Sequence, residues 1–209
     1  MCANNSLSGS GSDNALSPES LVGPSKFSFY RRPVKNTVPT REMTLWEVYL
    51  DIKSERNQGQ TKALRVLTDK EQARAFKAQN FDYVTFSGTF SKRNDVSLIR
   101  HSGLLTIDLD HVVDLLSLKT TLLADPYFDT ELLFVSPSGD GLKWIVSIDP
   151  QSHSHQHWFK AIANYLKITY KVEVDASGKD LSRACFLPYD PEVYIHPKYM
   201  GNKELTIKD

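Results

Sequence analysis

The feature that most restricts the fold of this chain is the segment 104–110, an apolar run that ends in two aspartates one position apart. Side chains alternate between the two faces of a β-strand, so Asp108 and Asp110 would share one face at the C-terminal end of a strand. Two neighbouring carboxylates repel each other, and a divalent cation relieves that repulsion. Oxygen ligands favour Mg²⁺ or Mn²⁺ over zinc. The segment therefore indicates either a metal site or a strand that leaves into a polar turn, with Asp110 as the N-cap of the next helix.

Length and composition narrow the class of protein. We expect one domain over residues 26–209 behind a flexible tail at residues 1–25, which is rich in Ser, Asn and Gly. The formal net charge is zero, so any contact with nucleic acid depends on local basic patches. Two cysteines exclude a disulfide framework. The sequence has neither the pattern of a membrane span nor that of a secretory signal, and we expect a cytoplasmic protein.

The hydrophobic pattern changes period along the chain and indicates both helices and strands. Expected helices cover 45–52, 61–67, 70–78, 112–123 and 158–166, the first with Thr44 as N-cap and the third opened by a capping box at 68–71. Expected strands cover 27–30, 83–90, 98–110 (as one or two strands), 132–136, 142–148, 172–175 and 184–187. Because the elements alternate without regular βαβ spacing, they favour an α+β fold with a mixed or antiparallel sheet flanked by helices.

A second group of polar residues lies in the turn of the hairpin expected between 132 and 148. Residues 136–143 read Ser-Pro-Ser-Gly-Asp-Gly-Leu-Lys. Glycines such as Gly141 let the backbone approach a ligand closely, and Ser136 and Ser138 offer hydroxyl groups. Lys143 adds a compact positive charge, which suits phosphate. The same residues also make an ordinary turn followed by a solvated lysine.

Two single residues further along extend this pattern. Asp175 ends a β-like run, and Arg183 follows a polar segment that contains glycine. Asp175 suits either a third metal ligand or a turn residue. Arg183 suits either a phosphate contact, through its planar guanidinium, or an ordinary surface position.

Histidines and basic residues form further clusters. Within the histidine cluster at 153–157, His155 and His157 have the spacing of the histidine pair in nucleases that attack DNA with a tyrosine, but the polar run around Gln156 favours a helix-entry loop. Two basic clusters with aromatic neighbours suit either a nucleic-acid backbone or solvated turns beside a core strand. These clusters are Arg31, Arg32 and Lys35, and Lys92, Arg93, Arg100 and His101.

Three segments in this order resemble the archaeo-eukaryotic primase superfamily. They are Asp-x-Asp after an apolar strand, the Ser-x-Ser-Gly-x-Gly hairpin, and an aspartate shortly before an apolar run that contains Arg183. More closely, segments 86–90, 101–110, 136–143 and 180–191 resemble the primase-like N-terminal domain of virulence-associated-E-type proteins of Bacteroides and relatives. The resemblance implies a primase-polymerase core on a modified RNA-recognition-type sheet, often fused to a helicase-like C-terminal module on mobile elements.

The resemblance also implies roles for individual residues. Asp108, Asp110 and Asp175 would be catalytic and hold Mg²⁺ or Mn²⁺. The residues that would bind the incoming nucleotide are Ser136, Ser138, Gly141, Lys143 and Arg183. Lys143 stands where many primases have a histidine, and a lysine exchanges a proton at neutral pH only when burial lowers its pKa.

We therefore expect a metal-dependent nucleotidyltransferase of primase or polymerase type that acts in the replication of a mobile element. Its partners would be single-stranded or primed DNA, nucleoside triphosphates and a helicase-like protein or module. The alternatives are a catalytically inactive primase-fold module that binds DNA in replication initiation or mobilisation, and a metal-dependent nuclease with the same aspartates. Convergence of Asp108, Asp110 and Asp175 beside Lys143 would favour the enzyme, and an Asp175 that points elsewhere would favour the binding module.

Overall fold

The computed structural model of the protein describes residues 25–201. Apart from Ser25, the tail expected at 1–25 lies outside the described residues. The strands are β1 (Lys26–Tyr30), β2 (Arg41–Thr44), β3 (Tyr83–Thr85), β4 (Gly88–Phe90), β5 (Leu98–His101), β6 (Leu104–Leu109), β7 (Thr130–Val135), β8 (Leu142–Ser147), β9 (Cys185–Phe186) and β10 (Tyr194–Ile195). The α-helices are α1 (Leu45–Lys53), α2 (Gln58–Arg65), α3 (Lys70–Asn80), α4 (Leu115–Leu123) and α5 (His155–Thr169).

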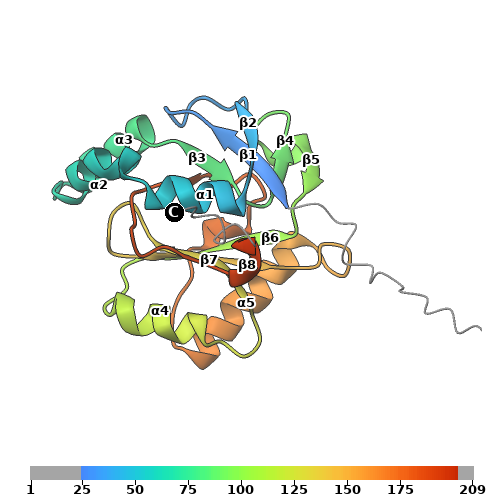
Figure 1. Ribbon diagram of the computed structural model, residues 1–209. Helices are drawn as coiled ribbons and strands as arrows, with labels where there is room; N and C mark the ends of the chain where they lie inside the picture. Colours follow the sequence, from blue (N-terminus) through green and yellow to red (C-terminus); the bar gives the residue numbers. More distant parts are fainter. Residues whose placement is uncertain (1–24, 202–209) are drawn as a thin grey trace, which may run out of the picture.

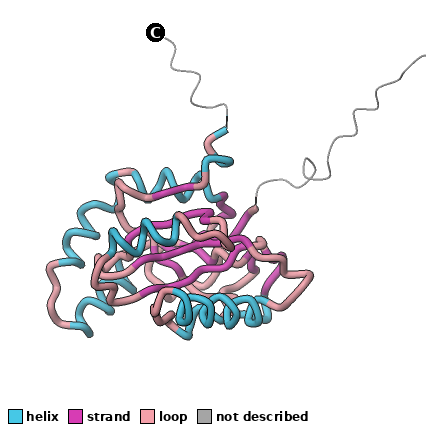
Figure 2. The backbone as a smooth tube through the Cα atoms, turned by 90° about the horizontal axis from the view of Figure 1, so that it is seen from below, coloured by secondary structure: helices cyan, strands magenta, loops and turns pink. Residues whose placement is uncertain are grey.

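Two four-stranded sheets and a two-stranded ribbon hold these strands. One sheet has the order β2-β1-β3-β9, the second has the order β10-β7-β8-β6, and β4 pairs with β5. All pairings between the described strands are antiparallel. Figure 2 shows the strands as a central band with helices on either side. The combination of helices with antiparallel sheets confirms the expected α+β class.

The sheet that contains β6, β7 and β8 separates two hydrophobic cores (Figure 1). On one face, Leu105, Ile107 and Leu109 of β6 belong to a core with residues of α4 and α5. On the other face, Leu104 joins a core with β1 and α1. The side chains along β6 therefore alternate between the two faces of the sheet, as expected for a strand. Asp108, an even-numbered residue like Leu104, belongs to the face directed towards β1 and α1.

The helix ends agree with the sequence at α1 and differ at α3 and α4. Thr44 caps α1 in a full capping box with Glu47, as expected. At α3 the N-cap is Asp69, whose carboxylate accepts a hydrogen bond from Gln72 N at 2.8 Å. The expected box at residues 68–71 is thus wrong by one residue, because Asp69 is itself a strong N-cap. Helix α4 begins only at Leu115 with Asp114 as N-cap, so Asp110 does not have the capping role that was its structural alternative.

The expected strand at 172–175 is wrong. Residues 171–175 form no ladder with any described strand, and the left-handed backbone of Lys171 (φ 57°) redirects the chain after α5. A single backbone hydrogen bond, from Asp175 N to the Asp108 carbonyl at 3.1 Å, ties this segment to β6. The two-residue strand β10 was not expected, because two residues carry no periodic pattern. The run expected at 98–110 divides into β5 and β6 at Gly103, whose φ is 79°.

Candidate functional site

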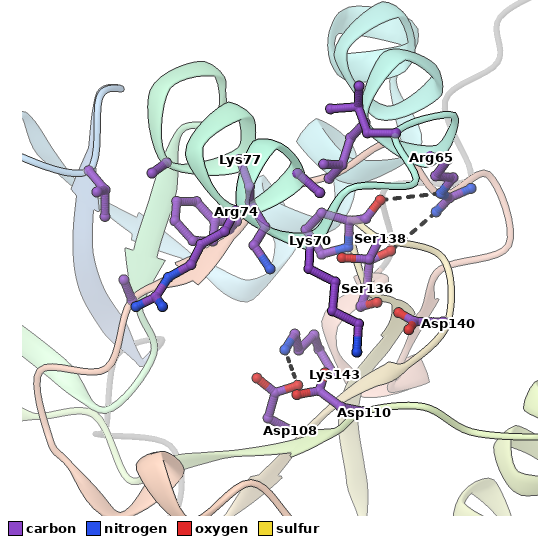
Figure 3. Close-up of a pocket in the computed structure, with 18 of the residues that line it drawn as sticks. Arg65, Lys70, Arg74, Lys77, Asp108, Asp110, Ser136, Ser138, Asp140 and Lys143 are labelled. Carbon is purple, nitrogen blue, oxygen red and sulfur yellow. Dashed lines mark hydrogen bonds and ion pairs between the residues drawn. The ribbon is translucent and has the colours of Figure 1, made fainter.

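The register between β6 and β8 places Asp108 directly opposite Lys143. Residues that face each other across an antiparallel pair point to the same side of the sheet. The Lys143 ammonium accordingly contacts the Asp108 carboxylate in an ion pair (Figure 3). Both side chains are largely buried, at 12% and 8% exposure. The charge at the end of β6 is therefore balanced by the neighbouring strand.

Three carboxylates converge at this end of β6. Oxygen atoms of Asp108, Asp110 and Asp175 all lie within 4.8 Å of one another. Asp108 is buried, Asp175 is half-buried and Asp110 is exposed. The period of two brings Asp110 beside Asp108, and the backbone hydrogen bond to the Asp108 carbonyl brings Asp175. The convergence named above as favouring the enzyme is present, and Asp175 points into the group.

Asp175 also caps the short 3-10 helix η4 (Ala176–Lys179). Its carboxylate accepts hydrogen bonds from Ser177 N at 3.0 Å and from Ser177 Oγ at 2.6 Å. Asp175 is therefore a turn residue, which was one of its two interpretations, and the same carboxylate also belongs to the group of three acids. These hydrogen bonds hold the side chain in the orientation that faces Asp108.

Arg183 links two of the carboxylates. One of its terminal nitrogens lies 2.8 Å from Asp175 Oδ2 and 3.5 Å from Asp108 Oδ2. Among residues 25–201, Asp110 has no ion pair or hydrogen bond to its carboxylate. Of the three acids, it is thus the one whose oxygens remain free for a ligand.

The surroundings shift the pKa values of Asp110 and Asp175 in opposite directions. Although Asp110 is exposed, the protein removes part of the water around its carboxylate, and this partial desolvation raises its pKa. The negative charge of Asp108 raises the pKa further, and the positive charge of Lys143 only partly offsets these effects. Burial alone would also raise the pKa of Asp175, but hydrogen bonds from Ser177 and the charges of Arg183 and Lys143 outweigh it, so this pKa is lowered. The cluster holds its negative charge on Asp175 more firmly than on Asp110.

The carboxylates of Asp108 and Asp110 line a pocket of about 800 Å³. Figure 3 shows α3 on one side of it and Asp108, Asp110 and Lys143 on the opposite side, with Ser136 and Ser138 beside them. Arg183 also lines the pocket, whereas Asp175 and Gly141 do not. A pocket of this size accommodates a nucleotide-sized ligand.

The hairpin turn between β7 and β8 is closed by its own backbone. Ser136 N donates to the Gly141 carbonyl at 2.8 Å, and Gly139 N donates to the Ser136 carbonyl at 3.0 Å. The Ser136 hydroxyl is buried, lines the pocket and has no hydrogen-bond partner in the part of the chain that the structure describes. A buried hydroxyl without a partner is unfavourable, so Ser136 is suited to a ligand in the pocket.

Gly141 serves the contact between strands. A Cβ at this position would lie 2.4 Å from the Leu109 carbonyl oxygen and 3.2 Å from the Asp110 Cα. The absence of a side chain therefore lets β8 start directly against the end of β6, beside the two aspartates. The sequence predicted that glycine here lets the backbone approach a ligand, whereas the close neighbour in the structure is the Leu109 carbonyl and Gly141 does not line the pocket.

Sequence reasoning missed the basic side chains of α2 and α3. Arg65 donates hydrogen bonds to the carbonyls of Ser136 at 3.2 Å and Pro137 at 3.3 Å, and so clamps the turn. Lys70, Arg74 and Lys77 line the pocket from α3. Their spacing of four and three residues places them on one helix face, which is the signal that could have grouped them.

The clusters singled out in the sequence lie mostly elsewhere. Of the two basic clusters, Arg93 alone lines the pocket. The histidines fit the helix-entry interpretation, because Ser154 caps α5 and His155 is its first residue. His155 Nδ1 lies 3.2 Å from His101 Nε2, and this histidine pair is not part of the carboxylate cluster.

Comparisons with known proteins give one match. The model of the family described as BT4734-like, N-terminal domain, matches residues 75–195. No curated protein and no solved structure matches the chain. In the described residues, none of the helices combines the length and the apolar character that crossing a membrane requires. Since the match covers more than half of the 209 residues and includes Asp108, Lys143 and Asp175, the protein belongs to the BT4734-like N-terminal domain family.

Proposed function

We propose that this domain is a metal-dependent nucleotidyltransferase of primase or polymerase type. The observation that carries the proposal is the convergence of Asp108, Asp110 and Asp175 with Lys143 and Arg183. Acid groups at one point and cations beside them match the needs of phosphoryl transfer, in which negative charge develops on a chain of phosphates. The order of the sequence motifs supports membership of the archaeo-eukaryotic primase superfamily as part of the same proposal.

The carboxylates fit Mg²⁺ or Mn²⁺. The donor set consists of oxygen atoms, and these atoms lie within 4.8 Å of one another. Asp110, which has no ion pair in residues 25–201, offers the free ligand, and Asp108 and Asp175 would complete the site. When bound, the ions would supply activation of a 3′-hydroxyl and stabilisation of the leaving pyrophosphate.

The remaining residues would orient the nucleotide. Lys143 and Arg183 both lie at the carboxylates and line the pocket, where they would offset the charge of the triphosphate. The Ser136 hydroxyl would donate to a phosphate oxygen, which would give this buried group its partner. Ser138 lies on the same turn and would act likewise.

The proposed substrates are nucleoside triphosphates and single-stranded or primed DNA. The proposed setting is the cytoplasm, in the replication of a mobile element with a helicase-like partner or module.

One observation favours the second candidate, a catalytically inactive primase-fold module that binds DNA. Lys143 pairs with Asp108, which would have to coordinate a metal ion in an active enzyme. An ammonium in this place neutralises the carboxylate without any metal. The second candidate predicts DNA binding that does not depend on Mg²⁺ and no incorporation of nucleotide.

A nucleotide-incorporation assay on a primed single-stranded template separates the two candidates. The purified chain would be supplied with labelled ribo- or deoxynucleotides and with Mg²⁺, Mn²⁺ or a chelator. We expect metal-dependent extension that is lost in Asp108→Asn and kept in Asp129→Asn, because Asp129 is exposed and lies outside the cluster. Equal extension by Asp108→Asn would contradict the assignment. Cleavage of the strand without extension would indicate a nuclease.

A further inference from the structure

Helix α3 faces the pocket more than it faces a core. None of its residues is fully buried. Ala73 and Ala78 line the pocket together with Lys70, Arg74 and Lys77. The helix is held mainly at its C-terminal end, where Val34 N donates to the Ala78 carbonyl at 2.7 Å and an Arg32 nitrogen donates to the Asn80 carbonyl at 3.0 Å. A helix placed in this way leaves its basic face available to a ligand.

The three cations on this face form no ion pair with an acidic side chain of the described residues. Lys70, Arg74 and Lys77 form no ion pair and no hydrogen bond with any side chain in residues 25–201. Lys77 makes a cation–π contact with the Phe186 ring, whose centroid lies 6.0 Å from the ammonium. Of the acids across the pocket, Asp108 is paired with Lys143 and Asp140 with His111, whereas Asp110 has no ion pair in residues 25–201. The three α3 cations therefore outnumber the one unpaired carboxylate at the end of β6, which leaves positive charge for a ligand to match.

Lys77 is the most informative of the three. Lys77 is half-buried, and burial lowers the pKa of its ammonium. The positive charges of Lys143 and Arg183 also lower this pKa, whereas the negative charges of Asp110 and Asp108 raise it. A positive charge that is partly removed from water and not paired is unfavourable. A negatively charged ligand between α3 and the carboxylates would relieve this cost. It would also accept a hydrogen bond from the buried Ser136 hydroxyl, which lines the same pocket.

The arrangement of the cations indicates which anion fits. Residues 70, 74 and 77 form a row along one helix face of about 10 Å, at 1.5 Å per residue. A row suits a chain of phosphates better than a single phosphate. The row lines the same pocket, of about 800 Å³, whose other side holds Asp108 and Asp110. A pocket of this size fits one nucleotide.

We propose that Lys70, Arg74 and Lys77 of α3 bind the triphosphate of a nucleoside triphosphate, so that the pocket selects triphosphates over monophosphates. The proposal rests on the function proposed above and names the residues that recognise its substrate class. The phosphate chain would lie between the basic side chains of α3 on one side of the pocket and the carboxylates at the end of β6 on the other.

Calorimetric titration of the full chain tests this proposal without any need for catalysis. The probes are ATP and AMP with Mg²⁺, and inorganic tripolyphosphate with a chelator. We expect wild type to bind ATP at least about tenfold more tightly than AMP, and Arg74→Gln and Lys77→Gln each to weaken ATP and tripolyphosphate about tenfold while AMP changes little. Lys62→Gln is the matched control, because Lys62 is exposed on α2, pairs with Gln58 and does not line the pocket.

Three results would overturn the proposal. The first is wild type that binds ATP no better than AMP, and the second is unchanged ATP affinity in both α3 variants. The third is loss of affinity for a single-stranded oligonucleotide with ATP affinity retained, which would assign α3 to nucleic acid. Because α3 buries no residue completely, melting temperatures should stay near that of wild type and show that the variants fold. If wild type selects triphosphates but incorporates no nucleotide, the proposed nucleotidyltransferase activity is contradicted and the role of α3 in triphosphate binding stands.

Discussion

Lys143 of β8 stands directly opposite Asp108 of β6, and its ammonium contacts a carboxylate that is only 8% exposed. Under the proposed function, this pair would set how the site responds to a metal ion. The ammonium balances the charge of Asp108, and it would compete with a metal ion for that carboxylate. The two effects have opposite signs, so they can be measured separately.

Replacing Lys143 with methionine should separate these effects. Without metal, the Lys143→Met variant leaves Asp108 buried beside two other carboxylates, and we expect it to lose about 1–3 kcal/mol of stability. Affinity for Mn²⁺ should rise, because the competing charge is gone, and nucleotide incorporation should fall. Urea denaturation and Mn²⁺ titration measure the first two. Lys167→Met, which removes the exposed pair with Glu173, should change stability by less than about 1 kcal/mol. Weaker Mn²⁺ binding by Lys143→Met would argue against competition.

Gly141 should be intolerant of any side chain. In Gly141→Ala the new Cβ would meet the Leu109 carbonyl oxygen at 2.4 Å, which forces β8 away from β6. We expect a loss of about 1–3 kcal/mol in the free energy of unfolding and weaker metal binding, because Asp110 moves with the strand end. Gly59→Ala is the matched control. Its Cβ would meet nothing within 4 Å, and alanine in helix α2 should stabilise by up to about 1 kcal/mol. Equal stability of the two variants would contradict the close contact.

The outcome at the acidic site shows what local pattern can and cannot predict. Period two along β6 predicted that Asp108 and Asp110 share a face, because alternation is a property of the strand itself. The strand expected at 172–175 was wrong, yet Asp175 reached the cluster. A single backbone hydrogen bond and a 3-10 cap place it there, and neither leaves a periodic trace in the sequence.

The basic side chains that line the pocket from α3 could not be assigned to it from the sequence, for a different reason. The sequence indicated α3 as a helix, but the same polar stripe forms whether a helix faces water or faces a pocket. The direction of Lys70, Arg74 and Lys77 depends on tertiary contacts at the far end of the helix, through Val34 and Arg32. The register of an antiparallel pair links residues 108 and 143, whereas no comparable rule links residue 77 to either.

Stability should depend on pH through His155. Burial, and to a lesser extent the neighbouring His101, lower the pKa of His155 to about 4, although the Gly178 backbone and Asp95 act in the opposite direction. The unfolded chain takes up this proton near its ordinary pKa of 6.5 and the folded chain only near 4. The stabilising contribution is therefore complete above about pH 6.5 and is lost as the pH falls towards 4, by about 2–3 kcal/mol.

The share of His155 can be isolated with two variants. His155→Gln should flatten the fall in urea midpoint between pH 6.5 and 4 relative to wild type. His157→Gln, on the same helix turn but exposed, should leave the fall unchanged. A wild-type slope retained by His155→Gln would assign the pH dependence to other groups.

Arg65 should set the rigidity of the turn that carries Ser136. In Arg65→Ala the carbonyls of Ser136 and Pro137 lose their hydrogen-bond donor. We expect amide hydrogen exchange at Gly139, whose N–H is bonded to the Ser136 carbonyl, to become faster by about tenfold, because opening of the turn costs less. Exchange within β6 should stay as in wild type, and an unchanged rate at Gly139 would show that the turn holds its shape without Arg65.

The contrast between β6 and α3 has a consequence for how such a protein can change over time. Asp108 sits on a strand whose neighbours are fully buried, so most substitutions there disturb both cores. Helix α3 buries no residue completely, so exchanging its basic residues costs little folding free energy. The match to the family model begins at residue 75 and leaves Lys70 and Arg74 outside it. If α3 binds the ligand as proposed, its preference can be redesigned through α3, whereas the demands of folding constrain the acidic end of β6.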